Sequence, residues 1–185
     1  MDRKHIAPDV YRQIQRLVPM VCVDAIVFDP AKGVLLGKRS EPPVQGVDWF
    51  IGGRIFYGEN PDEAIKRKVL DETGLHIRLP EGGGIIGVGS TTFTQGEPRH
   101  TINLTYLTEV RGGKLRETGE FSKYTWIKEI GDNLHPYVAG LLRKSGVFGD
   151  TPNVGVGQVT YTEEDPNGKL VASTSNLLRT GRKGE

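Results

Sequence analysis

The chain has 185 residues, of which 36% are hydrophobic and 25% are charged, and its formal net charge is +1. This size suits one domain with an extension, the near-neutral charge argues against nucleic acid as a partner, and the single cysteine excludes an internal disulfide. Because no apolar stretch approaches the ~18 residues of a membrane span and the N-terminus lacks a signal-peptide core, we expect a cytoplasmic protein without a membrane partner.

The elements are predicted in chain order from hydrophobic periodicity and turn residues. A short helix is expected over 8–17, and Pro19 prevents it from continuing. Two strands over 21–28 and 34–39 flank the turn D-P-A-K-G, which indicates a hairpin. A Pro/Gly-rich loop then leads to W-F-I and a glycine pair. Beyond the next helix, the pattern predicts strands over 84–94, 101–110 and 123–127 and a closing helix over 136–145.

The helix after the glycine pair carries start and stop signals. Asn60 is a good N-cap, Pro61 suits the first helical position, and Gly74 supplies a left-handed stop, so we expect a helix over 61–73. Ile65 and Val69 are spaced i, i+4 and should face a sheet.

The polar side of this helix holds two neighbouring carboxylates, Asp71 and Glu72, and two basic residues one turn earlier. Carboxylate oxygens are the ligands that Mg²⁺ or Mn²⁺ prefers. A solvated face with intrahelical ion pairs is the alternative. The preceding Gly52-Gly53 and the fixed spacing to Glu59 favour a metal and phosphate site.

The organisation is predicted as α/β, since strands interleave with helices, and the sheet should be mixed. After Val147 the composition changes, and two alternating runs flank D-P-N-G, which indicates a second hairpin. We therefore expect a domain over 1–148 and an extension over 149–185. Two strands alone are marginal in water, so this hairpin should dock on the domain or on a partner chain.

The segment from Gly53 to Leu75 reads G-x5-E-x7-R-K-V-L-D-E-T-G-L, which resembles the Nudix box G-x5-E-x7-R-E-U-x-E-E-x-G-U, where U is aliphatic. Two positions depart from it: Asp71 replaces a glutamate, and Lys68 stands where the family has an acidic residue near the metal. The resemblance implies the Nudix fold, a mixed β-sheet sandwiched between α-helices, here with a C-terminal β-hairpin extension.

A narrower resemblance runs from about Val10 to Leu79. The motifs L-L-G-K-R, P-V-Q-G and G-G-R are similar to those of the GDP-mannose mannosyl hydrolases, a Nudix subgroup. This resemblance implies Mg²⁺-dependent hydrolysis of a nucleotide sugar (GDP-mannose or GDP-glucose-like) to sugar and nucleoside diphosphate, by attack on the anomeric carbon. It also implies a homodimer.

In this subgroup the last glutamate of the Nudix box is the metal ligand that remains, and the resemblance assigns the ligands of this chain accordingly. Glu72 is the main metal ligand, and the carbonyl oxygen of Gly52 is a second ligand. Asp71 contacts the metal only indirectly, through another ligand or through a water molecule. Lys68 places an ammonium one turn from Glu72, which disfavours a crowded multi-metal site, so we expect one Mg²⁺ rather than three.

The resemblance also assigns the substrate contacts. Arg39 and Arg54 match positions that neutralise the leaving diphosphate, for which guanidinium groups are well suited. Asp24 matches a residue near the sugar, with a strand carboxylate that caps a loop as the equal alternative. Arg67 is expected to anchor the helix to its loop by pairing with Glu59.

The general base is where this chain departs from the subgroup, which places a glutamine and a histidine before a Tyr-x-Trp strand. Here Glu120 and Phe121 take those two positions. Phenylalanine cannot accept a proton, so Glu120 is the predicted metal-binding and catalytic carboxylate, with Glu117 as a second carboxylate and His100 as a weaker candidate.

Two other functions remain open. One is an ordinary Nudix pyrophosphohydrolase that cleaves the phosphorus–oxygen bond of a nucleoside diphosphate derivative, with Glu120 as base. The other is a binding module that recognises a nucleotide sugar without turnover, for which Lys68 and Phe121 are the arguments. The ring that stacks on the nucleotide base is not assigned by the sequence; the candidates are Trp49, Phe56, Tyr57 and Phe93.

Overall fold

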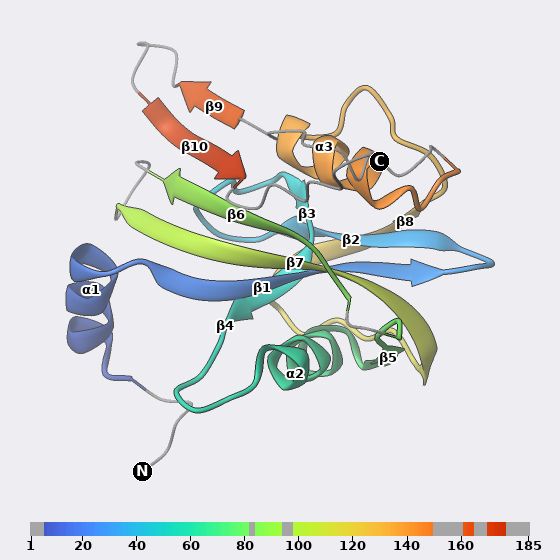
Figure 1. The fold of residues 1–185 in the computed structure, drawn as a ribbon, viewed down its shortest axis with the longest axis horizontal. Helices are drawn as coiled ribbons and strands as arrows, with labels where there is room; N and C mark the ends of the chain where they lie inside the picture. Colours follow the sequence, from blue (N-terminus) through green and yellow to red (C-terminus); the bar gives the residue numbers. More distant parts are fainter. Residues whose placement is uncertain (1–5, 82–83, 94–97, 150–160, 165–169, 177–185) are drawn as a thin grey trace, which may run out of the picture.

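The computed structural model describes residues 6–81, 84–93, 98–149, 161–164 and 170–176 (Figure 1). Its helices are α1 (Pro8–Leu17), α2 (Pro61–Thr73) and α3 (Pro136–Ser145), with the bounds that the sequence predicts. Its strands are β1 (Met20–Asp29), β2 (Gly33–Arg39), β3 (Asp48–Trp49), β4 (Ile51–Arg54), β5 (Leu75–Arg78), β6 (Ile85–Phe93), β7 (Arg99–Gly113), β8 (Phe121–Ile127), β9 (Tyr161–Glu164) and β10 (Leu170–Asn176). None of these described helices is long and apolar enough to span a bilayer.

The strands form one mixed sheet in the order β3-β2-β1-β7-β6-β10-β9, while β4 pairs with β1, β5 with β7 and β8 with β2. The central pair, β1 and β7, is parallel, and the other pairs are antiparallel. Helix α2 lies on one side of the sheet and α3 on the other (Figure 1). The predicted α/β class with a mixed sheet between helices is confirmed.

Each face of the sheet has its own hydrophobic core. Along β1, Val23 and Val27 pack toward α2, whereas Ile26 packs toward α3, as the alternation of side chains in a strand requires. Helix α2 contributes Ile65 and Val69, both fully buried, to the first core. The predicted inward face of α2 is therefore confirmed.

The ends of α2 are set by local chemistry. The Oδ1 atom of Asn60 accepts a hydrogen bond from the backbone N–H of Asp62 at 2.8 Å, and Pro61 begins the helix. Gly74 ends it in the left-handed conformation at φ 73°, where a Cβ atom would meet the Lys114 carbonyl oxygen at 2.7 Å. Both predicted caps are confirmed, and they fix which α2 residues reach the site.

Strands β9 and β10 pair antiparallel, as the second predicted hairpin requires. Strand β10 also pairs with β6, from Ala172 opposite Phe93 to Asn176 opposite Gly89, and thereby extends the sheet of the same chain (Figure 1). The turn D-P-N-G lies outside the described residues. The division of the chain at 148/149 stays a prediction.

Candidate active site

A pocket of about 290 Å³ opens where β1, β4, β7 and α2 meet. The charged side chains that line it are four basic and two acidic: Arg39, Arg54, Lys68, Arg99, Asp24 and Glu120. An excess of cations in a concave site attracts a polyanion such as a diphosphate. Cys22 also lines the pocket, but burial raises the pKa of its thiol to about 12, so the thiol stays protonated at neutral pH.

Glycines bring the backbone of β4 close to β1 beside this pocket. Gly52 pairs with Asp24 and Gly53 with Val23 across the two antiparallel strands. A Cβ atom at Gly52 would lie 2.5 Å from the Oδ1 atom of Asp24, so no larger residue fits there without a shift. The glycine pair therefore provides backbone at the pocket wall where a side chain would fill the space.

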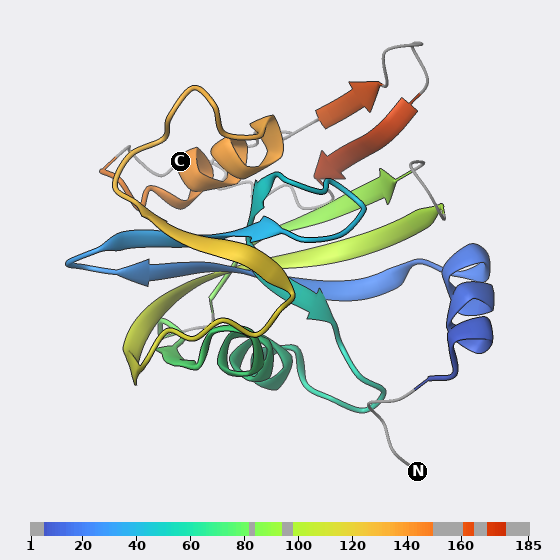
Figure 2. The ribbon, with the colours of Figure 1, turned by 180° about the vertical axis from the view of Figure 1, so that it is seen from behind.

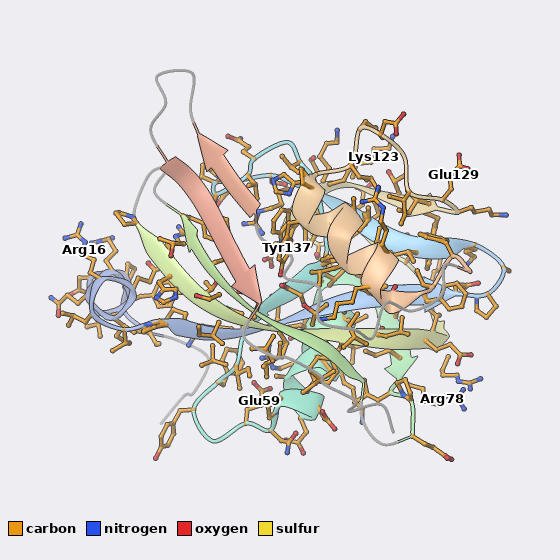
Figure 3. The ribbon with its side chains drawn as sticks, turned by 45° about the horizontal axis from the view of Figure 1, so that its top comes forward. Arg16, Glu59, Arg78, Lys123, Glu129 and Tyr137 are labelled. Atoms are coloured by element: carbon orange, nitrogen blue, oxygen red, sulfur yellow. The ribbon has the colours of Figure 1, made fainter. Side chains whose placement is uncertain are left out.

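The loop between β4 and α2 is held by an ion pair, as predicted. The Arg67 guanidinium donates to both carboxylate oxygens of Glu59, at 2.5 and 2.8 Å, and to the Arg54 carbonyl oxygen at 3.3 Å. Glu59 in turn accepts a hydrogen bond from the Phe56 N–H at 2.9 Å, and the pKa of its carboxyl is lowered by Arg67. Glu59 lies between α2 and its loop in Figure 3. Arg67 is thus an anchor of the loop.

Glu72 is buried at the end of α2, with 3% of its surface exposed. Its carbonyl oxygen accepts hydrogen bonds from the hydroxyls of Tyr124, at 2.6 Å, and Thr118, at 2.8 Å. The Thr118 bond ties the segment between β7 and β8, which runs along α2 (Figure 2), to the end of the helix, and the Tyr124 bond ties β8 to the same carbonyl. They bring the loop that carries Glu120 next to the box helix.

The Glu72 carboxylate forms an ion pair with the Lys68 ammonium, one turn earlier on α2. Within the described residues, neither of its oxygens has a hydrogen-bond partner. The Lys68 Nζ atom also lies 3.5 Å from an oxygen of Glu120, whose side chain is 47% exposed. Burial lowers the pKa of Lys68, and Glu120 opposes that effect. The structure therefore brings two of the predicted metal ligands, Glu72 and Glu120, within ion-pair distance of the Lys68 ammonium.

Asp71 does not reach this point, contrary to the expectation that both helix carboxylates line one side. Its side chain is 59% exposed and lies 4.0 Å from Arg67, on a different row of the helix. Successive residues of a helix are separated by about 100° around the axis, so one carboxylate turns inward and its neighbour outward. The assignment of Asp71 as a ligand or close partner of the metal is therefore not supported by this geometry.

Few donors at this site could hold a divalent cation. Across the part of the chain that the structure describes, no three acidic, histidine or cysteine side chains are grouped to hold a metal. The candidate oxygen donors are the buried Glu72 carboxylate, which has no hydrogen bonds within the described residues, the half-exposed Glu120 carboxylate and the backbone of the glycine pair. Hard oxygen donors in this number suit a single Mg²⁺ that keeps several other ligands from water or substrate.

Phe121, at the position where the subgroup has a histidine, is a core residue. Its side chain is buried, packs on Gly37 of β2 and lies 5.6 Å from the Tyr124 ring between centroids. Glu120, the preceding residue, lines the pocket instead. Of the other candidate bases, Glu117 is exposed outside the pocket lining, and the Nε2 atom of His100 lies 2.8 Å from the Ser90 hydroxyl, also outside that lining.

Asp24 is held by two residues that the sequence does not indicate. Its Oδ2 atom accepts hydrogen bonds from the Asn103 amide at 2.7 Å and from the Tyr137 hydroxyl at 3.3 Å. Tyr137 comes from α3 and lies toward the middle of the molecule (Figure 3), where it stacks on Trp49 with centroids 5.0 Å apart. Asp24 is therefore a pocket carboxylate that is hydrogen-bonded by side chains of β7 and α3.

The pH dependence of stability should report on Asp24. Burial raises the pKa of its carboxyl from 3.8 to about 6, although Asn103 and Tyr137 lower it by hydrogen bonding. Between pH 4 and 6 the folded protein then holds a proton that the unfolded chain has lost, so the free energy of unfolding falls as pH rises. Asp24→Asn should flatten this slope and increase stability at pH 7 by about 3 kcal/mol, given 1.36 kcal/mol per unit of pKa.

Urea unfolding at several pH values between 3.5 and 7.5 checks this expectation. Asp132→Asn, at an exposed loop position, is the matched control and should keep the slope. An Asp24→Asn protein with an undiminished slope would show that another group carries the titration.

Comparison with known proteins identifies the family to which the chain belongs. Residues 18–130 match the model of the NUDIX domain, so the fold and the box residues at the pocket define the class. The chain belongs to the Nudix family. Among solved structures, it is similar in fold to a MutT protein from Methanosarcina mazei, with a TM-score of 0.55, 22% identity and coverage of 69% of this chain and 94% of that one. A diadenosine tetraphosphate hydrolase candidate from Jonesia denitrificans gives a TM-score of 0.59, with 21% identity and coverage of 72% and 97%.

Two curated relatives have higher sequence identity to this chain than these two structures. The ADP-ribose pyrophosphatase of Methanocaldococcus jannaschii is 36% identical over 101 residues, which cover 54% of this chain and 56% of that protein. The low-salt glycan biosynthesis protein Agl8 of Haloferax volcanii is 27% identical over 136 residues, which cover 72% of this chain and 86% of that protein. The chain thus spans little more than half the length of the first relative.

Proposed function

We propose that this Nudix protein is a Mg²⁺-dependent hydrolase of a nucleoside diphosphate sugar, resembling GDP-mannose or GDP-glucose, and that it releases sugar and nucleoside diphosphate. The observation that carries the proposal is a pocket with four basic side chains in front of a single buried box carboxylate, Glu72. We also propose that it acts in the cytoplasm, and that it is a homodimer, as the subgroup resemblance implies. The similarity to a glycan biosynthesis protein is consistent with a sugar-containing substrate.

In this proposal the basic side chains bind the leaving diphosphate. The Nε atom of Arg39 donates to the Pro43 carbonyl oxygen at 2.9 Å, which fixes the guanidinium at the pocket wall. The Arg54 guanidinium lies over the rings of Tyr11 and Phe56, 5.5 and 4.8 Å from their centroids. Fixed cations stabilise charge that develops on the departing phosphate. A divalent cation bound by Glu72, Glu120 and the Gly52 carbonyl would supply further positive charge to the same phosphate oxygens.

The acidic side chains have separate roles in this proposal. Asp24 accepts a hydrogen bond from a sugar hydroxyl, since it lines the pocket and its position is fixed by Asn103 and Tyr137. Glu120 accepts the proton of the attacking water, since it is exposed to the pocket and the neighbouring Phe121 has no basic group. Of the four candidate rings, Trp49 and Phe93 line the pocket, as do Tyr11 and Phe50, and these rings are available to contact the nucleotide base.

Cleavage of the phosphorus–oxygen bond is the second candidate function. The specific observation in its favour is the 36% identity to an ADP-ribose pyrophosphatase. The residues that bind the diphosphate are the same in both candidates, and the difference lies in which atom the water attacks. Lys68 at the acidic box position argues against the metal cluster that ordinary Nudix hydrolysis uses.

One experiment separates the candidates. The protein is incubated with a panel of nucleoside diphosphate sugars and ADP-ribose in the presence of Mg²⁺, and the products are identified. Free sugar with nucleoside diphosphate supports the proposal, whereas nucleoside monophosphate with sugar phosphate shows the ordinary pyrophosphohydrolase. Binding without turnover across the panel shows the recognition module.

A further inference from the structure

The Lys68 ammonium occupies the point where the predicted metal ligands meet. It pairs with Glu72 and lies 3.5 Å from Glu120. It also lies against the glycine pair, because a Cβ atom built on Gly53 would be 3.0 Å from Nζ and 2.7 Å from Cε of Lys68. The ammonium is therefore surrounded by the oxygen donors and the backbone that would otherwise surround a cation.

Lys68 also separates Glu72 from the pocket. Lys68 and Glu120 belong to the pocket lining, and Glu72 does not. The Lys68 side chain is 16% exposed, whereas that of Glu72 is 4% exposed. A cation that enters through the pocket meets the ammonium before it can reach the buried carboxylate.

A buried carboxylate needs a positive partner, because an unpaired charge is costly away from water. Lys68 provides that partner in the metal-free protein, since neither Glu72 oxygen has a hydrogen bond within the described residues. A divalent cation at Glu72 would lie close to the ammonium, and two positive charges at that distance repel strongly. The Glu72 carboxylate therefore cannot bind the Lys68 ammonium and a divalent cation at the same time in this geometry.

We propose that Lys68 is a resident counter-ion of Glu72, which a divalent cation must displace in order to bind. This inference rests on the proposed metal site, and it adds that the site is closed by the protein's own cation until the metal arrives. The displaced ammonium turns into the pocket beside Arg54 and Glu120, where it can contact a diphosphate. The free protein should accordingly bind divalent cations weakly.

Titration with Mn²⁺ in the absence of substrate tests the proposal, with free Mn²⁺ followed by electron paramagnetic resonance. Lys68→Gln removes the charge and keeps an amide that can donate to Glu72, so it should bind Mn²⁺ at least tenfold more tightly than the wild-type protein. Lys66→Gln makes the same charge change at an exposed position of α2 and should leave the affinity unchanged. Equal affinity in Lys68→Gln and wild type would overturn the proposal, even if wild-type turnover requires Mg²⁺.

Two further proteins keep the test decisive. Adding Glu72→Gln to Lys68→Gln should abolish the gained affinity, and a gain that persists would show that the metal binds elsewhere and that the metal site of the proposed function is wrong. If Lys68→Gln does not fold, the wild-type protein is labelled by reductive ¹³C-methylation, with the Lys68 signal assigned by Lys68→Arg. Addition of Mg²⁺ should shift that signal, and an unshifted signal contradicts displacement.

Discussion

Replacing Glu72 by glutamine is expected to abolish Mg²⁺-dependent turnover while the protein stays folded. Glutamine keeps the size of the side chain, and the main-chain carbonyl of residue 72 keeps its bonds from Tyr124 and Thr118. What is lost is the buried carboxylate of the Nudix box. Loss of residues that only support a ligand costs about 10–100-fold in activity or metal affinity, so loss of the ligand itself should exceed 100-fold.

The matched control is Asp71→Asn, the same chemical change at the next residue of α2. Because Asp71 is 59% exposed and turned toward Arg67, that variant should retain nearly normal rates. Steady-state kinetics with Mg²⁺ and circular dichroism on both variants give the comparison. Equal losses in the two proteins, or a normal rate in Glu72→Gln, would show that Glu72 does not hold the metal.

Hydrolysis in ¹⁸O water is expected to place the label in the sugar and none in the nucleotide. Glu120 lines the pocket, whereas the neighbouring Phe121 is buried under β2 and has no basic group. A carboxylate that accepts a proton from water as an oxocarbenium-like centre develops is the arrangement of inverting sugar hydrolysis. Glu120→Gln should slow the reaction by ~10²–10⁴-fold, the usual contribution of a general base.

Glu117→Gln is the control for this second prediction, since Glu117 lies in the same loop, exposed and outside the pocket lining. Its rate should match that of the wild-type protein. Label recovered in phosphate would establish phosphorus–oxygen cleavage and reduce the mannosyl-hydrolase resemblance to shared ancestry. A Glu120→Gln protein with a normal rate would exclude this base for either reaction.

The sequence predicts the helices well because their ends are determined by adjacent residues. Asn60 and Gly74 act within one turn of the chain, and the bounds of α2 follow from them. The strands are predicted less completely. Strand β5, which has four residues, carries no clear alternation and pairs with the end of β7, so its identity depends on a distant partner. Strand β7 likewise extends beyond its predicted bounds where β5 and β6 pair with it.

The sequence predicts only part of the site, because some of its contacts join residues that are far apart in the chain. The box spacing locates Glu72 and Lys68, since both lie on one helix, but the outward turn of Asp71 depends on how α2 packs. Tyr137 reaches Asp24 from 113 positions away, and no local pattern indicates such a contact. Arg99 lines the pocket although it precedes the strand predicted over 101–110.

The parallel pairing of β1 with β7 has a consequence for how the chain folds. Met20 lies opposite Thr101, so the centre of the sheet joins segments 81 positions apart, and β2, β4 and α2 all lie between them. Contacts of such long sequence separation form slowly, because the entropy of a large loop must be lost before the contact is gained. During synthesis, β1 has no partner on that side until residue 101 and its neighbours have left the ribosome. The β1·β2 hairpin is available much earlier and can hold β1 in register until β7 arrives.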